Sequence, residues 1–473
     1  VWPLVAVAER ARNHAFAGAA VAAAVLLAGI AILGQTRAIV PAVIVSALVM
    51  VAVLPGRRAR LWALIAIGAG VAVAAPQLLD VFESAGGATP DPDTIRSGVA
   101  ALLGIAALTG VVFAVLRWLA RTAEPRVGAR PLATASTVAL VAVVVVGAVA
   151  GLAAVGDPVD RLRDEARAFK NLGVGSAQSS RSRFTSGGGN RYDYWRVAAN
   201  QFRDEPVKGL GAGNYDRTYF LERQTSEDIK QAHSLPLQTL SELGLVGGAG
   251  LLLFLGAIVA GFVRRARAAR TSPSDLGLAV AGGGMFLVWL VHTSVDWLHL
   301  IPGVTGIALC GAAVLVAPWA RKHAAPGRSR LRLATVVLCA LVVLFGATMV
   351  GRSALADKYR SDAQDIVATD PRGALDKTAD SLSLNDESLP AYYVQAAAHA
   401  RLGGYEPARA SLLEATRREP HDFVPWGLLG DLAVRRGDFA QARRDYGRAS
   451  ELNPRDAGLK QLAQRPRSAL TGR

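Results

Sequence analysis

The sequence predicts an all-α membrane protein, a polytopic helical bundle of about nine spans with a large extracytoplasmic loop and a C-terminal helical domain. Three observations predict this fold. Hydrophobic residues make up 52% of the 473 residues and come in long blocks. Lys and Arg cluster in alternate connections between these blocks. After the last block the composition becomes charged and alanine-rich, with a repeat period of 34 residues.

The apolar blocks have the length that an α-helix needs to cross the hydrocarbon core, about 17–25 residues. The second block is short and contains Pro41, so its ends are the least well defined. The chain begins at Val1 without a signal-peptide pattern, and Val1 to Val7 reads as the end of an earlier span. The predicted spans are 14–33, 39–54, 61–79, 97–120, 133–153, 242–263, 277–297, 303–319 and 332–351.

Basic residues mark the connections that we expect on the cytoplasmic side, because short cytoplasmic loops are enriched in Lys and Arg. The loop at 154–235 is too long for this rule, so its outward side follows from its neighbours, as does that of the C-terminal domain. The basic groups are Arg10/Arg12, Arg57/Arg58/Arg60, 117–130, 264–270 and 321–332. The expected domains are N-terminal spans (1–153), an extracytoplasmic loop (154–241), C-terminal spans (242–351) and an extracytoplasmic helical domain (352–473).

The C-terminal domain has the pattern of stacked helical hairpins. Gly403 matches Gly437, and Ala408 matches Ala442, at a period of 34. The pattern resembles tetratricopeptide repeats, with units at 389–422 and 423–456 and a degenerate unit near 355–388. Because each unit of such a stack contacts mainly its neighbours, we expect the membrane part to fold and to remain active without residues 357–473. The domain is either a spacer or a concave surface for a protein or glycan partner.

The net charge of +15 does not indicate nucleic-acid binding. Much of the excess lies in short connections, where membrane topology and anionic lipid head groups explain it. The expected partner of these charges is therefore the lipid bilayer. Cys310 and Cys339 lie inside predicted spans, which argues against a disulfide framework. No zinc-ligand spacing is present, so we expect no metal and no cofactor.

The most informative stretch runs from 190 to 248, where a polar, arginine-bearing segment precedes an apolar helix. It contains, in order, Arg191, Trp195, Pro206-Val-Lys-Gly-Leu-Gly211, His233, Leu237-Gln238 and Glu242-Leu-Gly244. Two further elements lie outside it, Gly34-Gln-Thr-Arg37 and His292-Thr-Ser-Val-Asp296. This ordered set resembles the O-antigen ligase and O-antigen polymerase superfamily of bacterial envelope glycosyltransferases, over residues 1 to about 320.

The resemblance implies a metal-independent, multi-pass glycosyltransferase of the bacterial cytoplasmic membrane. Such an enzyme moves a saccharide from a polyprenyl-diphosphate carrier to the hydroxyl of a glycan or glycolipid acceptor, on the outer face, in cell-envelope polysaccharide biosynthesis. A ligase and a polymerase differ only in their acceptor, and the sequence does not separate them. Two other classes remain open: a transporter or flippase of envelope glycolipids, and a non-enzymatic scaffold that displays the helical repeats.

The chemistry of this transfer suits the residue types of the loop. A diphosphate leaving group needs its developing charge neutralised, and Arg can bond phosphate oxygens bidentately. Acceptor attack is helped by a base that titrates near neutral pH, which suits His. We expect His233 to be the catalytic base, and Arg191 and Arg37 to hold the diphosphate. Further candidates are Arg196 and Arg217 for substrate binding, and His292, Asp296 and Glu242 for shaping the site.

Most of these candidates also have a structural alternative, and a structural or solvated role is favoured over a catalytic one for Arg196 and Arg217. His233 could be a helix-entry residue hydrogen-bonded in the interface, and Arg191 a solvated loop charge. Arg37 could extend to the interface from a helix end. His292 and Asp296, four residues apart, would share one helical face and could satisfy each other. Asp91-Pro-Asp93 could bind a metal-diphosphate, although a proline turn is favoured there.

The alternating basic connections generate a topology prediction. Cysteine variants at Ser226 and Ser450 should label with a membrane-impermeant thiol reagent in intact cells, because both positions are expected outside. A cysteine at Ala59 should label only after the cells are opened. If Ala59→Cys alone labels in intact cells, the orientation in the membrane is the opposite of the predicted one, and the basis for an outward-facing site is lost.

Overall fold

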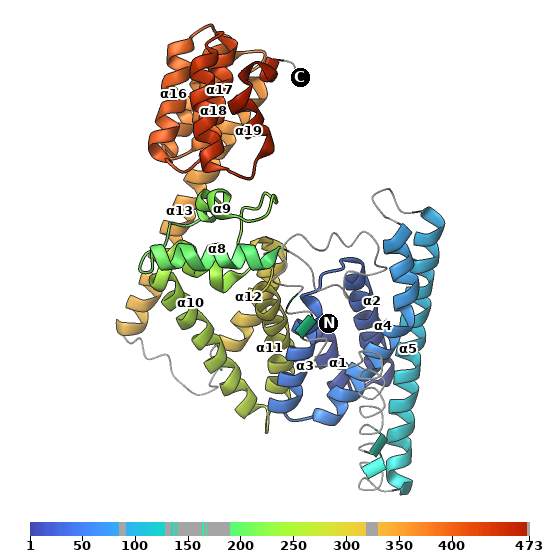
Figure 1. Ribbon diagram of the computed structural model, residues 1–473. Coiled ribbons are helices and arrows are strands. Elements are labelled where there is room, and N and C mark those ends of the chain that lie inside the picture. Colours follow the sequence, from blue (N-terminus) through green and yellow to red (C-terminus); the bar gives the residue numbers. More distant parts are fainter. Residues whose placement is uncertain are drawn as a thin grey trace. The chain divides into compact units, whose positions relative to one another are not determined.

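The computed structural model describes residues 1–84, 91–127, 134–135, 138–139, 163–164, 167, 190–317 and 330–470 (Figure 1). Within these ranges every regular element is a helix, which agrees with the predicted all-α class. The chain divides into two compact units. Unit 1 comprises Val1–Tyr215 and Ile229–Pro318, and unit 2 comprises Asp216–Asp228 and Trp319–Arg473.

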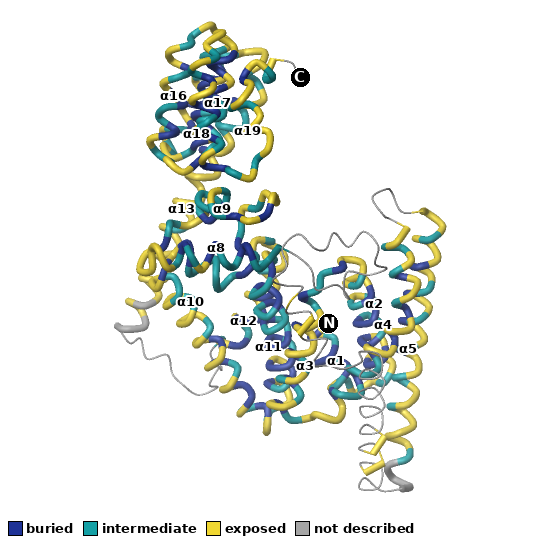
Figure 2. Tube along the Cα trace, viewed as in Figure 1, coloured by how far each residue is buried: buried dark blue, intermediate teal, exposed yellow. Residues whose placement is uncertain are grey.

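Six described helices are long and apolar enough to cross a membrane. Only 17% of the residues in the apolar windows of α5 and α10 are buried, and most of α5 is exposed in Figure 2, as expected of helices whose outer faces contact lipid. The chain is therefore a multi-pass helical membrane protein. The number of nine spans stays a prediction, and the span predicted at 133–153 lies outside the described residues. The six helices are α2 (His14–Leu33), α4 (Arg57–Ser84), α5 (Pro92–Val127), α10 (Leu235–Ala268), α11 (Pro273–Thr293) and α13 (Arg330–Ile366), and the shorter apolar helices α3 (Ile39–Val53) and α12 (Pro302–Val316) cover two more predicted spans.

The core of unit 1 forms where the short helix α1 (Trp2–Arg10) packs against α2, α4 and α11. The Trp2 indole is buried and donates to the Ser46 hydroxyl at 3.2 Å. It fills the space beside Gly284, where an added Cβ would lie 2.2 Å from the ring. The α2 and α5 backbones approach closely at Gly18 and Gly110, the small-residue packing typical of membrane helices.

A buried ion pair lies at one end of this core, between the end of α1 and the start of α4. Arg60 and Glu9 are 2.9 Å apart, with 0% and 4% of their side chains exposed. The same guanidinium donates to the carbonyl oxygens of Met50 and Pro55, both at 2.7 Å. Because all these partners are present, the buried charges are compensated. Arg60, which belongs to a connection predicted to be cytoplasmic, therefore also links three segments of the chain.

Helix α10 is interrupted at Gly244, which has φ 59° and ψ −154°. The segment Pro206–Gly211, here called the glycine loop, fills the interruption. Backbone hydrogen bonds from Leu210 to Ser241 (3.0 Å) and from Leu245 to Pro206 (2.8 Å) join the two segments. An added Cβ at Gly209 would lie 2.4 Å from the Glu242 carbonyl carbon. The absence of a Cβ at Gly209 therefore allows the backbones of the two segments to approach closely.

The glycine loop follows α8 (Arg191–Asp204), the helix that carries Arg191 and Trp195, the first residues of the ordered set in 190–248. Helix α8 packs against α10 and lies across its end in Figure 1. The Gln201 amide donates to the Tyr215 carbonyl at 2.7 Å, and the Tyr215 hydroxyl donates to the Tyr194 carbonyl at 3.0 Å. Both tyrosines are buried. These contacts fix the orientation of α8 within unit 1.

Unit 2 contains α13 and a stack of helical hairpins. The turns at Gly403 and Gly437 have φ of 79° and 81°, and Ala408 and Ala442 are fully buried between paired helices. The tetratricopeptide assignment stays a prediction. Residues 216–228, from the predicted extracytoplasmic loop, also belong to this unit. The helices are α14 (Pro371–Leu384), α15 (Leu389–Arg401), α16 (Tyr405–Arg418), α17 (Val424–Arg435), α18 (Phe439–Leu452) and α19 (Ala457–Gln464), with most of α9 (Tyr215–Glu222).

We predict that Gly244→Ala destabilises unit 1 by more than about 2 kcal/mol. A positive φ costs a non-glycine residue about 1–2 kcal/mol, and the new Cβ would lie 2.4 Å from the Val207 carbonyl oxygen. Thermal unfolding in detergent measures the effect. Gly250→Ala is the matched control in the same helix, because nothing lies within 4 Å of its Cβ position. Equal unfolding temperatures for the two variants would contradict this account of the interruption.

Candidate functional site

The Asp296 carboxylate lies at the centre of a polar cluster in unit 1. Arg191 Nη2 donates to its Oδ2 at 3.0 Å. His233 Nδ1 lies 3.6 Å from Oδ1, and His292 Nε2 lies 3.9 Å from Oδ2. The Trp297 backbone N–H donates to Oδ1 at 2.8 Å. Four residues that the sequence singles out at three separate places are therefore brought together.

The position of Asp296 differs from the expectation. The span predicted at 277–297 places His292 and Asp296 on one helical face, but α11 ends at Thr293. Asp296 lies in the turn that follows, ahead of the short 3₁₀ helix η2 (Leu298–Leu300). Because the chain turns there, the carboxylate can accept from Arg191 and approach His233 as well as His292. The two residues are not simply a mutually satisfied pair.

His233 immediately precedes Ser234, the N-cap residue of α10. Its φ of 52° is unusual for a residue with a side chain. Its ring packs on Tyr194 at a centroid distance of 5.2 Å and lies 6.4 Å from the Trp297 ring. Its Nδ1 is buried. The imidazole is thus held on an aromatic support with one nitrogen towards Asp296, and 19% of the side chain stays exposed.

Arg191 is the first residue of α8. Its side chain is 31% exposed, whereas that of Asp296 is 7% exposed. The bond to Asp296 uses one of the five N–H donors that a guanidinium carries. A partly exposed guanidinium beside a buried carboxylate can therefore bind an anion while the carboxylate holds it in place.

Electrostatics keep Asp296 ionised. Burial raises the pKa of its carboxyl, but the His233 imidazole, the Trp297 N–H and the Arg191 charge together hold that pKa below its usual value. His299 lies close enough to sense the charges of Asp296 and His233, and burial lowers its pKa. His299, Tyr194 and Trp297 are not among the sequence candidates. The only signal for His299 is its place three residues after Asp296, next to the predicted span.

The other candidates have different surroundings. Arg196 forms a 2.7 Å ion pair with the buried Asp193 of its own helix. Arg217 belongs to unit 2 and donates to Asp422 at 3.0 Å. Glu242 is buried beside the glycine loop and accepts from the Gln238 amide at 3.2 Å. Arg37 is half-buried in the turn between α2 and α3, and its place in the site stays a prediction.

The Asp91-Pro-Asp93 segment has the contacts of a helix start. Asp91 accepts from the Thr94 backbone N–H at 3.0 Å and from its hydroxyl at 2.8 Å, which is N-terminal capping of α5. Asp93 forms an exposed pair with Arg96. In the part of the chain that the structure describes, no group of three or more His, Cys, Asp or Glu side chains has the arrangement of a metal site.

Comparison with known families gives one match. Residues 94–252 match the family model described as O-antigen ligase. The match covers less than half of the chain and includes α8, the glycine loop and His233. Asp296 and Arg37 lie outside it. No curated protein matches the chain. The family match supports the superfamily resemblance and a membrane glycosyltransferase-like activity in envelope polysaccharide biosynthesis.

The lowered pKa of Asp296 has a measurable consequence. The ionised carboxylate stabilises the fold above the ordinary aspartate value of about 3.9, and this stabilisation is lost as pH falls through the lowered pKa. We predict that Asp296→Asn lowers the free energy of unfolding by about 1–3 kcal/mol at neutral pH. In thermal unfolding, the difference from the wild type should persist from pH 7 to 5 and shrink below about pH 4. A difference that vanishes already between pH 7 and 5 would contradict this assignment.

Proposed function

We propose that the chain transfers a saccharide from a polyprenyl-diphosphate carrier to the hydroxyl of a glycan or glycolipid, on the outer face of the bacterial cytoplasmic membrane. The match of residues 94–252 to the O-antigen ligase family is the premise. The observation that carries the proposal is the shared carboxylate: Asp296 contacts both Arg191 and His233. An anion-binding group and a base therefore lie on either side of one fixed charge.

In this proposal His233 is the general base. Asp296 lies next to Nδ1, so the imidazole would carry its proton there and leave Nε2 free to accept the proton of the acceptor hydroxyl. The hydroxyl oxygen then bonds to the anomeric carbon of the donor sugar, and the bond from that carbon to the diphosphate oxygen breaks. Asp296 would stabilise the imidazolium that forms, the role that a buried carboxylate has beside a catalytic histidine.

The leaving diphosphate takes the electron pair of the broken bond. We assign Arg191 to this charge, and Arg37 as its second cation, because planar guanidinium groups bind phosphate oxygens in pairs. Two such cations supply the stabilisation that a metal ion provides in other sites. Arg196 already has a carboxylate partner in Asp193, so we assign it to the support of α8.

The predicted membrane topology places the proposed site on the outer side of the membrane. With the basic connections in the cytoplasm, the loop that carries Arg191 and His233 faces outward, where the lipid-linked donor is presented. The few charged side chains of the predicted spans, such as Arg117, Glu242 and Asp296, lie near the ends of those spans. A transporter would need polar groups along a path through the spans, so this observation favours transfer at the surface over transport.

The test separates binding from chemistry in a membrane assay with a lipid-diphosphate donor. His233→Ala should reduce turnover by about 10²–10⁴-fold, the range for loss of a general base. Its affinity for the donor should change little, because a neutral imidazole adds little to phosphate binding. Arg191→Ala should weaken donor binding and turnover together. Arg191→Lys should rescue only partly, because a point charge cannot reproduce the guanidinium fork.

Two controls accompany this experiment. Arg96→Ala removes an arginine from an exposed ion pair in unit 1 and should leave donor binding at the wild-type level. EDTA should change turnover little. Near-normal turnover of His233→Ala at matched protein levels would refute the base assignment. If EDTA abolishes saccharide transfer and an added divalent ion restores it, a metal ion and not the arginines neutralises the leaving diphosphate.

A further inference from the structure

The loop that carries the proposed site also contains a segment that belongs to unit 2. Residues 216–228, here called the docked segment, lie between α8 and His233 in the sequence. They group with the C-terminal helices and not with the membrane helices. The chain leaves unit 1 after Tyr215 and returns at Ile229, four residues before His233.

Two arginines of the docked segment bind the equivalent turns of two successive repeat units. Arg217 donates to Asp422 at 3.0 Å and lies 3.8 Å from Glu419. Arg223 donates to the Asn453 side chain at 2.8 Å. The turns are equivalent in the repeat, since Glu419-Pro-His-Asp and Asn453-Pro-Arg-Asp begin 34 residues apart. The spacing of the arginines therefore matches the spacing of the repeats.

Burial makes these contacts strong. Arg223 is 4% exposed and Asn453 is 1% exposed. The Phe220 ring packs edge-on against Phe423 at a centroid distance of 5.1 Å, and the Arg223 guanidinium lies 5.0 Å from the Phe220 ring. Hydrogen bonds in a buried, largely apolar contact are protected from water, and breaking one leaves a buried polar group without a partner.

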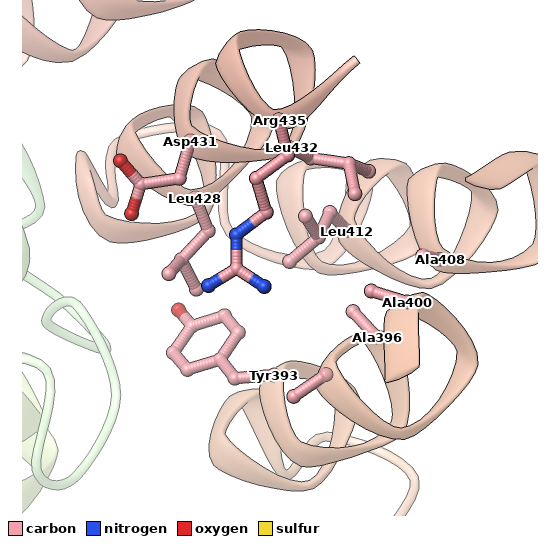
Figure 3. Close-up of a pocket in the computed structure, with 10 residues that line it drawn as sticks. Tyr393, Ala396, Ala400, Ala408, Leu412, Leu428, Asp431, Leu432 and Arg435 are labelled. Atoms are coloured by element: carbon pink, nitrogen blue, oxygen red, sulfur yellow. The ribbon is translucent and has the colours of Figure 1, made fainter. Parts of the chain in front are cut away.

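Asp422 connects the docked segment to the interior of the stack. The Tyr393 hydroxyl donates to Asp422 at 2.8 Å, on the same oxygen that accepts from Arg217. Burial raises the pKa of Tyr393, and the neighbouring Asp422 adds to this, so the hydroxyl remains a donor at all physiological pH values. The Tyr393 ring lines a pocket with Leu428 and Arg435, shown in Figure 3.

We infer that unit 2 is a positioning element of the proposed transferase: by binding the docked segment through Asp422 and Asn453, it holds the chain that leads to His233. The inference rests on the proposed function. Tyr215 is anchored on α8 at one end, and His233 follows closely at the other. Fixing the middle of this connection reduces the conformations open to His233. Loss of residues 357–473 would release the segment, contrary to the expectation from the sequence that these repeats are dispensable.

The test uses full-length protein in detergent or lipid discs. Tyr393→Phe removes one hydrogen bond to Asp422 and keeps the ring. Asn453→Ala removes the partner that Arg223 has in the hairpin stack, while Glu227 and Asp228 of the docked segment remain as its other acceptors. Backbone amide exchange over 216–235 should become about tenfold faster, the factor expected for one hydrogen bond to a charged group. Turnover should fall roughly 10–100-fold, as for misplaced catalytic groups, while the KM for the lipid-diphosphate donor stays unchanged.

Tyr446→Phe is the matched control. It removes a tyrosine-to-aspartate hydrogen bond of 2.6 Å, to Asp431, within the same stack. Neither residue contacts the docked segment among the described interactions. Exchange over 216–235 and turnover should stay at wild-type values. Arg217→Ala should reproduce the effect of Tyr393→Phe, and Arg217→Lys, which keeps the charge, should show a smaller effect.

The outcomes are distinct. If the segment exchanges faster but residues 229–235 and turnover do not change, unit 2 does not position His233, and the proposed function stands. If Arg217→Ala instead raises the donor KM at constant turnover, Arg217 contacts the donor and the inference is wrong. If the wild type transfers no saccharide, the proposed function is wrong. Backbone amide exchange at 229–235, compared between the variants and the wild type, then decides by itself whether unit 2 orders His233.

Discussion

The interruption of α10 at Gly244 is the constraint on which the proposed site in unit 1 depends. A helix that enters a membrane cannot leave backbone groups without partners in the hydrocarbon core, because no water is available there to replace them. Here the glycine loop supplies the partners, through hydrogen bonds that run in both directions between 206–211 and 241–246. The two segments are separated in the sequence by the docked segment and His233. Closing this contact therefore fixes both ends of the region that carries the proposed chemistry.

This contact explains why two glycine-containing parts of the motif occur together. Gly209 lies against the Glu242 backbone, and Gly244 lies against Val207, so each glycine provides room for the other segment. Only residues without a Cβ allow both approaches at these positive φ values. Once α8 is placed on α10 in this way, Arg191 at its first turn and His233 ahead of α10 can meet the same carboxylate.

Much of the fold follows from length and composition. Apolar blocks such as 14–33 coincide with helices, and the glycines of 206–211 lie where two backbones approach closely. The partner of that approach does not follow, because nothing local distinguishes Glu242 from other positions. The central role of Asp296 also depends on where α11 ends, and helix ends are set by tertiary contacts as much as by sequence. The partner of Arg217 lies 205 residues away, beyond the reach of any local pattern.

The binding of two successive repeat turns has an evolutionary consequence. Each unit of a repeat array contacts only its neighbours, so the array can gain or lose a whole unit without changing the contacts within the others. Arg217 and Arg223 span one unit boundary, so a duplication or deletion outside the turns at 419 and 453 preserves both contacts. An inserted unit with different turn residues between these turns would separate them and remove the acceptor that one arginine has in the stack. Length variation in homologous chains is therefore expected on either side of this pair of turns and excluded between them.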